Sequence, residues 1–144
     1  MTERRLWLRV VLAALAVEEL MIGIWALVDP AGFYRGFPGL GRHWASADGP
    51  YNHHFVGDTG AGFFAVGVLL VIAVVWMHRD VIRAAFVVVI AHAFPHFLYH
   101  LTHPAKALSG TDNAMSTGGL AVVTAVAIVC LIALARGRDA VVAG

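Results

Sequence analysis

Four histidines recur at intervals of three or four residues in the second half of the chain: His92, His96, His100 and His103. At about 100° per residue they form one stripe along a helix face, with Tyr99 beside them. Imidazoles three or four residues apart on a helix can hold one metal ion, which makes His96/His100 and His100/His103 candidate ligand pairs. The stripe spans about 16 Å at 1.5 Å per residue, so one ion cannot contact all four histidines. We therefore interpret His92, which lies deeper, as a group that either supports a metal ligand or relays a proton.

Two other apolar segments also carry polar side chains. Glu18 and Glu19 stand near the middle of the first segment, and His54 and Asp58 share a helix face at the start of the second. A carboxylate at mid-membrane depth must be paired or protonated, and the histidine stripe is its evident internal partner. Adjacent helical residues are about 100° apart, so at most one of the two glutamates points squarely at the bundle axis. The sequence does not decide which.

These polar residues divide into two candidate groups. The candidate catalytic residues are Glu18, Glu19, Asp58 and His92. The candidate metal ligands are His54, Asp58, His96, His100 and His103. Because ionisable groups at membrane depth usually face the interior of a bundle, their origin in three helices predicts one buried histidine–carboxylate site.

The segments that must position these side chains are strongly apolar. Of 144 residues, 60% are hydrophobic and 13% are charged, and the mean hydropathy is +0.77. Soluble domains carry roughly a quarter charged residues. Runs of about 20 apolar residues, enough to cross a bilayer, are expected at 6–28, 54–77, 81–101 and 114–135. The sequence predicts a single all-α domain over 1–144, an integral membrane antiparallel four-helix bundle.

The connection over 29–53 and the distribution of basic residues predict an orientation. The connection is rich in glycine, proline and aromatic residues, which favour the headgroup region, so we expect an extracytoplasmic loop on the membrane surface. One side of the membrane receives Arg4, Arg5, Arg9, Arg79, Arg83, Arg136 and Arg138, and the other receives Arg35, Arg42 and Lys106. This asymmetry predicts a multi-pass protein of the plasma (inner) membrane with both termini cytoplasmic. The polar site then lies in the outer half of the bundle.

Composition also excludes some classes of function. A formal net charge of +1 gives no electrostatic basis for binding nucleic acid. Cys130 is the only cysteine, which excludes an intrachain disulfide and any CxxC motif. It stands in an apolar run, and we interpret it as a small core residue.

Several functions fit a buried histidine–carboxylate site. Our first interpretation is a transition-metal site (Fe, Zn or Cu) for redox or hydrolytic chemistry, which would make the chain a metal-dependent oxidoreductase if it is an enzyme. Haem with axial ligands from the second and third helices is a variant. The alternatives are a conduit for protons, metal ions or small molecules, a metal-free acid/base enzyme on a lipid-soluble substrate, and an accessory subunit. The expected partners are the bilayer, a small hydrophobic substrate, a membrane subunit or a second copy of the chain.

Short motifs also carry a family resemblance. They are Asp29-Pro30 with Phe33-Tyr34, then His54-x3-Asp58-x-Gly60-Ala61, then His96-x3-His100. The layout resembles small four-helix bacterial membrane proteins, including actinobacterial ones, of the DoxX-like kind. Some DoxX-like members are associated with quinone-linked oxidoreductase complexes, although no cofactor motif here carries that role over. His53-His54 and the run from His92 to His103 also resemble the histidine boxes of membrane di-iron hydroxylases and desaturases.

Overall fold

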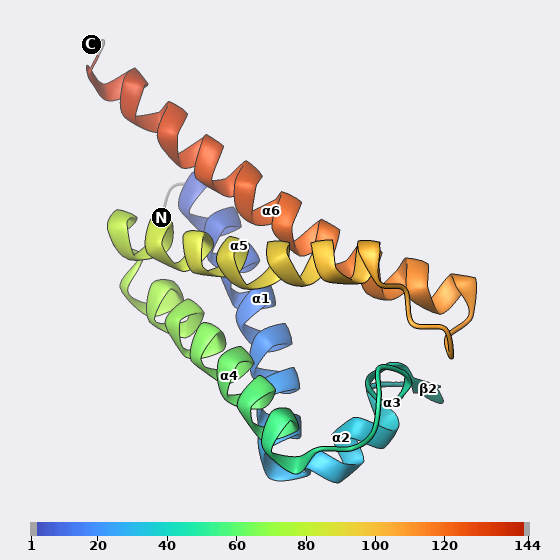
Figure 1. The fold of residues 1–144 in the computed structure, drawn as a ribbon. Helices are drawn as coiled ribbons and strands as arrows, with labels where there is room; N and C mark the ends of the chain where they lie inside the picture. The colour runs from blue at the N-terminus through green and yellow to red at the C-terminus, as the bar shows by residue number, and fades with distance from the viewer. Residues whose placement is uncertain (1–2, 143–144) are drawn as a thin grey trace.

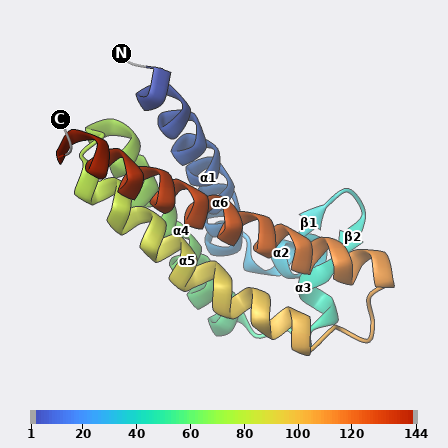
Figure 2. The ribbon, with the colours of Figure 1, turned by 90° about the horizontal axis from the view of Figure 1, so that it is seen from above.

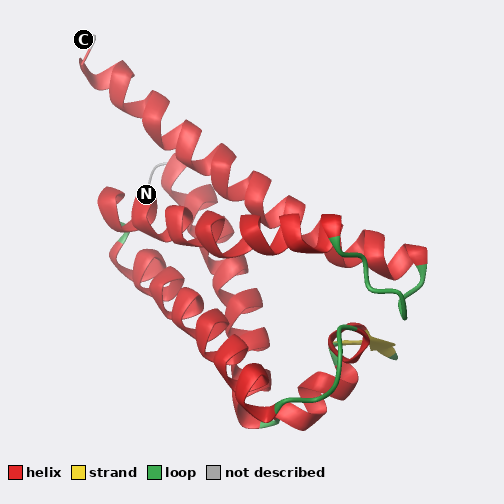
Figure 3. Cartoon of the chain, in the orientation of Figure 1, coloured by secondary structure: helices red, strands yellow, loops and turns green. Residues whose placement is uncertain are grey.

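Four long helices dominate the computed structural model, which describes the backbone of residues 3–142 and the side chains of residues 6–136 (Figures 1 and 3). These helices are α1 (Glu3–Val28), α4 (His53–Trp76), α5 (Arg79–Thr102) and α6 (Gly110–Val142). Within the described residues, four helices are long and apolar enough to cross a membrane, and they lie close to the four predicted apolar runs. α6 begins at Gly110, earlier than predicted. The side chains of Arg4, Arg5 and Arg138, which entered the orientation argument, lie outside the described residues.

The long helices associate as two pairs, α1 with α4 and α5 with α6 (Figures 1 and 2). Close approach of α1 and α4 depends on glycine. A Cβ on Gly23 would lie 2.5 Å from the backbone nitrogen of Phe64, and a Cβ on Gly67 would lie 2.7 Å from Cγ of Leu20. Small residues allow such contact in lipid, where no hydrophobic drive pulls helices together.

Replacing Gly23 by valine should separate α1 from α4. The obstacle is backbone, which cannot move aside as a flexible side chain can, so we expect a loss of about 1–3 kcal/mol in the free energy of unfolding. Unfolding by sodium dodecyl sulfate in mixed micelles would measure it. Gly62→Val is the matched control, because nothing lies within 4 Å of a Cβ built there. Equal losses in the two variants would contradict this account of the helix contact.

The two pairs meet at one end of the molecule and diverge towards the other (Figure 1). The meeting point is a cluster of buried apolar side chains from all four long helices, with Leu12, Leu70, Phe86 and Ala127 fully buried. The two termini and the α4–α5 turn lie at this same end. The diverging end therefore holds the space in which a site can form.

The connection between α1 and α4 is folded rather than a plain loop. It contains α2 (Pro30–Gly36), β1 (Pro38–Gly39), β2 (Arg42–His43) and α3 (Trp44–Ala47). Asp29 caps α2 by accepting a hydrogen bond from the Gly32 backbone N–H at 2.9 Å, and the two strands pair as a short antiparallel hairpin. Phe33 is buried, with its ring edge-on to Trp25 at 5.7 Å. Of the aromatic side chains expected at the membrane surface, Phe33 therefore packs inward, whereas Tyr51 is 41% exposed.

Candidate functional site

A cavity of about 530 Å³ occupies the diverging end of the molecule. Its walls come from all four long helices and from the connection between α1 and α4, and most of the lining is apolar. Aromatic rings supply much of that apolar surface: Phe33, Tyr34, Phe37, Trp44, Phe55 and Phe63. Pockets of this size with a few convergent polar groups are typical small-molecule sites.

The floor of the cavity carries a carboxylate–imidazole pair that joins α1 to α5. Glu19 is 5% exposed, and its Oε2 lies 3.7 Å from Nδ1 of His92. No described residue gives that oxygen a hydrogen bond. The His92 ring also meets Phe63 edge-on at 4.6 Å. A buried carboxylate oxygen without a hydrogen bond is costly, so this group is a marked departure from ordinary packing.

Two more histidines of α5 line the cavity above that pair. Nε2 of His96 and Nε2 of His100 lie 3.0 Å apart, and both side chains are partly buried. At this distance one imidazole donates a hydrogen bond and the other accepts it, so the two rings hold opposite protonation at Nε2. Two nitrogens on a tetrahedral zinc ion lie roughly 3.3 Å apart. The pair could therefore share either a proton or a metal ion.

The two adjacent glutamates have different environments. Both line the cavity, but Glu19 is buried against His92 whereas Glu18 is exposed. Glu19 stands one turn beyond Leu15 and Ala16, which belong to the apolar core cluster. This position carries its carboxylate onto the top of the core, and the structure thereby decides what the sequence left open.

His54 and Asp58 were expected in the same cluster, and the structure places them elsewhere. Nε2 of His54 lies 3.3 Å from Oδ2 of Asp58, with 81% and 64% of the side chains exposed, and neither lines the cavity. The rotation of α4 explains this. Gly60 turns towards α1 and Phe63 towards the cavity, which leaves the His54–Asp58 face outward.

His103 also leaves the predicted stripe. α5 ends at Thr102, and the backbone of His103 is not helical, with φ −129° and ψ 65°. Its ring stacks on Tyr99 with centroids 4.9 Å apart and stays exposed. α5 itself continues as one helix through Pro95. The stripe that reaches the cavity therefore consists of His92, His96 and His100.

The part of the chain that the structure describes contains no group of three or more His, Cys, Asp or Glu side chains arranged to hold a metal ion. The His96–His100 pair supplies two nitrogens, and any further ligands would have to come from outside these residues. Cys130 is 2% exposed in the apolar core cluster, consistent with its interpretation as a small core residue.

The aromatic part of the cavity was not predicted from the sequence. One signal was present, since Asp29-Pro30 is a typical helix start, with an acidic cap followed by proline at the first helical position. It predicts that the connection begins with a helix, and α2 carries Phe33 and Tyr34 on one side of the cavity. The inward direction of Phe37 and Trp44 depends on contacts far apart in the chain.

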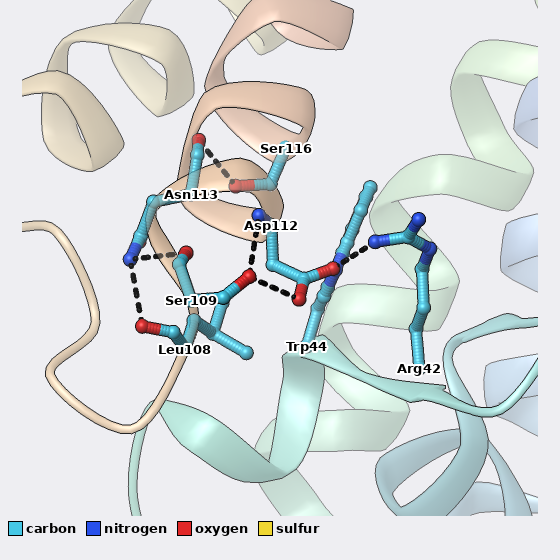
Figure 4. A network of polar contacts seen from close by, with 7 residues as sticks. All are labelled: Arg42, Trp44, Leu108, Ser109, Asp112, Asn113 and Ser116. Carbon is cyan, nitrogen blue, oxygen red and sulfur yellow. Dashed lines mark hydrogen bonds and ion pairs between the residues drawn. The ribbon is translucent and has the colours of Figure 1, made fainter.

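One such contact joins the connection to the start of α6 (Figure 4). The carboxylate of Asp112 accepts hydrogen bonds from the Arg42 guanidinium and from Trp44 Nε1, the latter at 2.9 Å, while Ser109 Oγ donates to it at 2.7 Å. Asn113 beside it binds the backbone of Ala105 through two bonds of 3.0 Å. This network fixes Trp44 as part of the cavity wall.

Replacing Asp112 by asparagine should loosen the connection over the cavity. Charge-assisted hydrogen bonds are about twice as strong as neutral ones, so the Arg42 contact weakens most. We expect faster hydrogen exchange and faster proteolysis between residues 37 and 48. Asp80→Asn is the matched control, because Asp80 is 94% exposed in its pair with Arg83 at the other end of the molecule. Unchanged exchange in the Asp112 variant would show that the connection is held by its aromatic packing alone.

The chain matches no protein-family model, no curated protein and no solved structure.

Proposed function

We propose that the chain is a multi-pass protein of the plasma membrane that binds a lipid-soluble small molecule in this cavity and exchanges a proton with it. One observation carries the proposal: apolar walls enclose a buried carboxylate oxygen that no described residue hydrogen-bonds, next to an imidazole. Apolar walls favour a ligand that partitions into lipid, and the carboxylate and imidazole are the groups that move protons.

The proposed topology is an antiparallel four-helix arrangement with both termini in the cytoplasm, which puts the cavity in the outer half of the membrane. Excess arginine at the end that carries the termini supports this orientation. We also propose kinship with the DoxX-like proteins, on the motifs that resemble theirs. The proposed activity does not depend on that kinship.

Proton exchange would use residues of α1 and α5. His92 can hold a proton at Nδ1 next to the Glu19 carboxylate, and the bond between His96 and His100 can pass one along the helix. A lipid-soluble molecule with an acidic or basic group at this level would meet both. The opposite half of the molecule is filled by the apolar core cluster, so binding fits this structure better than passage through it.

Filling the cavity tests the proposal. Gly119 lines the cavity and Gly118 does not, yet nothing lies within 4 Å of a Cβ on either. The full chain, purified in dodecyl maltoside, would be titrated with the neutral lipophilic fluorophore N-phenyl-1-naphthylamine. We expect Gly119→Leu to weaken binding at least about tenfold, or 1.4 kcal/mol, and Gly118→Leu to leave it unchanged. Equal binding by both variants and the wild type would refute the proposal.

The His96–His100 geometry favours one second candidate, a transition-metal ion bound by this pair. Fe, Zn and Cu all bind imidazole nitrogen, and water or the bound molecule would fill the other coordination positions of the metal. Haem fits less well, because His54 of α4, its expected axial ligand, lies outside the cavity. Calorimetric titration with each metal would test the candidate. Stoichiometric binding that is lost in both His96→Ala and His100→Ala supports it, and binding that survives in both contradicts it.

A further inference from the structure

The cavity lining carries acidic side chains but no lysine or arginine among the described residues. Three carboxylates line it, namely Glu18, Glu19 and Asp48. Arg42, in the connection between α1 and α4, is already paired with Asp112. The basic side chains of the lining are the imidazoles of His92, His96 and His100.

The uncharged part of the lining also favours a positive ligand. Aromatic faces attract cations within about 6 Å of the ring centroid, most strongly where water is excluded. Phe33 and Phe37 lie 4.8 Å apart, and Phe37 meets Trp44 at 6.1 Å, so these rings form a continuous aromatic wall. The carboxylate of Glu19 lines the same cavity.

Energetics select between ligand charges. Glu19 Oε2 is buried without a hydrogen bond from any described residue, and a carboxylate in an apolar setting is stabilised by an opposite charge. A neutral ligand leaves this cost in place, and an anion increases it. A cation offsets it.

Building on the proposed function, we infer that the ligand class is the lipophilic cation: an organic ammonium or similar positive group on an apolar body. The positive group lies between the glutamates and the aromatic wall, and the apolar body fills the remaining space. Nothing in this inference requires a covalent step.

Two probes of matched shape and opposite charge test the inference, tetraphenylphosphonium and tetraphenylborate. Their binding to the full chain in dodecyl maltoside at pH 8 would be measured by equilibrium dialysis, with Gly119→Leu giving the background from micelles. We expect the phosphonium to bind at least about tenfold more tightly than the borate. Glu19→Gln should weaken phosphonium binding at least about thirtyfold, the low end for losing one partner of a buried charge pair. Glu18→Gln should weaken it by a smaller factor, and Asp80→Asn should not change it.

The outcomes separate this inference from the proposed function. If both ions bind alike, or the borate binds more tightly, and Gly119→Leu still abolishes binding, the ligand class is wrong while the cavity still binds small molecules. Unchanged phosphonium binding in both glutamine variants overturns the inference in the same way. If Gly119→Leu weakens the binding of neither ion and does not weaken that of the neutral fluorophore, the proposed function itself fails. Melting curves of the variants show whether a loss reflects unfolding, and Glu18→Gln decides the matter if Glu19→Gln does not fold.

Discussion

Replacing Glu19 by methionine is expected to stabilise the protein while abolishing its binding of a cationic amphiphile. The carboxylate is buried, the nearest nitrogen of His92 is 3.7 Å away, and one oxygen lacks a hydrogen bond among the described residues. A buried carboxylate oxygen without a hydrogen bond carries a desolvation penalty of about 1–3 kcal/mol, and methionine removes it. Unfolding by sodium dodecyl sulfate in mixed micelles would measure the gain.

Substituting the partner residue His92 should change the stability in the opposite direction. His92→Phe leaves Glu19 buried without its imidazole, and removing one partner of a buried pair costs about 3–5 kcal/mol. The double variant should recover most of that loss, because no buried charge then remains. A cycle in which the two single effects simply add would show that Glu19 and His92 do not interact. Glu18→Met is the control for the first substitution, since Glu18 is exposed and its replacement should change stability little.

A gain in stability combined with loss of binding would indicate that the Glu19 carboxylate serves binding rather than stability. Groups that are costly to bury persist where function needs them. A loss of stability in Glu19→Met would instead assign the carboxylate a structural role in joining α1 to α5. The two results thus distinguish a ligand site from a helix clamp.

The four helices could be predicted from the sequence because their signal is local. Each span shows itself as a long apolar run, and the structure shifts the ends by only a few residues. α6 starts earlier than predicted because the Ser109 hydroxyl accepts a hydrogen bond from the Asp112 backbone N–H at its start, and the polar residues Asp112 and Asn113 lie in its first turn. Hydropathy alone places such residues outside a span.

The divergence of the two helix pairs could not be predicted in the same way. It depends on which helices touch, and that is set by contacts such as Gly23 against Phe64, whose partners are far apart in the chain. Gly57 and Gly62 look equivalent to Gly60 and Gly67 in the sequence, yet a Cβ on either would meet nothing within 4 Å. Composition identifies small residues but not the face on which they are used.

The candidate site was predictable where helical periodicity decides and not elsewhere. His92, His96 and His100 share one face of α5 and reach the cavity together, while His103 lies past the end of the helix. His54 and Asp58 share a face too, but periodicity relates residues within one helix and does not fix the rotation of that helix against its neighbours. The position of the connection between α1 and α4 at the cavity depends on the hydrogen bond from Trp44 to Asp112, a contact between distant segments.

Truncating Phe86 to alanine should cause a large loss of stability. Phe86 is fully buried where the two helix pairs meet, in contact with the cluster that holds them together. In soluble cores Phe→Ala costs about 3–5 kcal/mol. Lipid is as apolar as the core, so the transfer part of that cost is small here and the packing part remains, which lowers the expectation to about 2–3 kcal/mol.

The neighbouring residue supplies the control. Val87 is 54% exposed on the same helix, so Val87→Ala should change the free energy of unfolding by less than about 0.5 kcal/mol. Because the cluster joins the pairs at one end only, Phe86→Ala should also allow them to move apart. A nitroxide pair on Val10 and Val129, exposed residues of α1 and α6, would report a broader distance distribution in that variant. An unchanged distribution with the same loss of stability would show that other contacts hold the two pairs at their angle, the Glu19–His92 pair being the next to test.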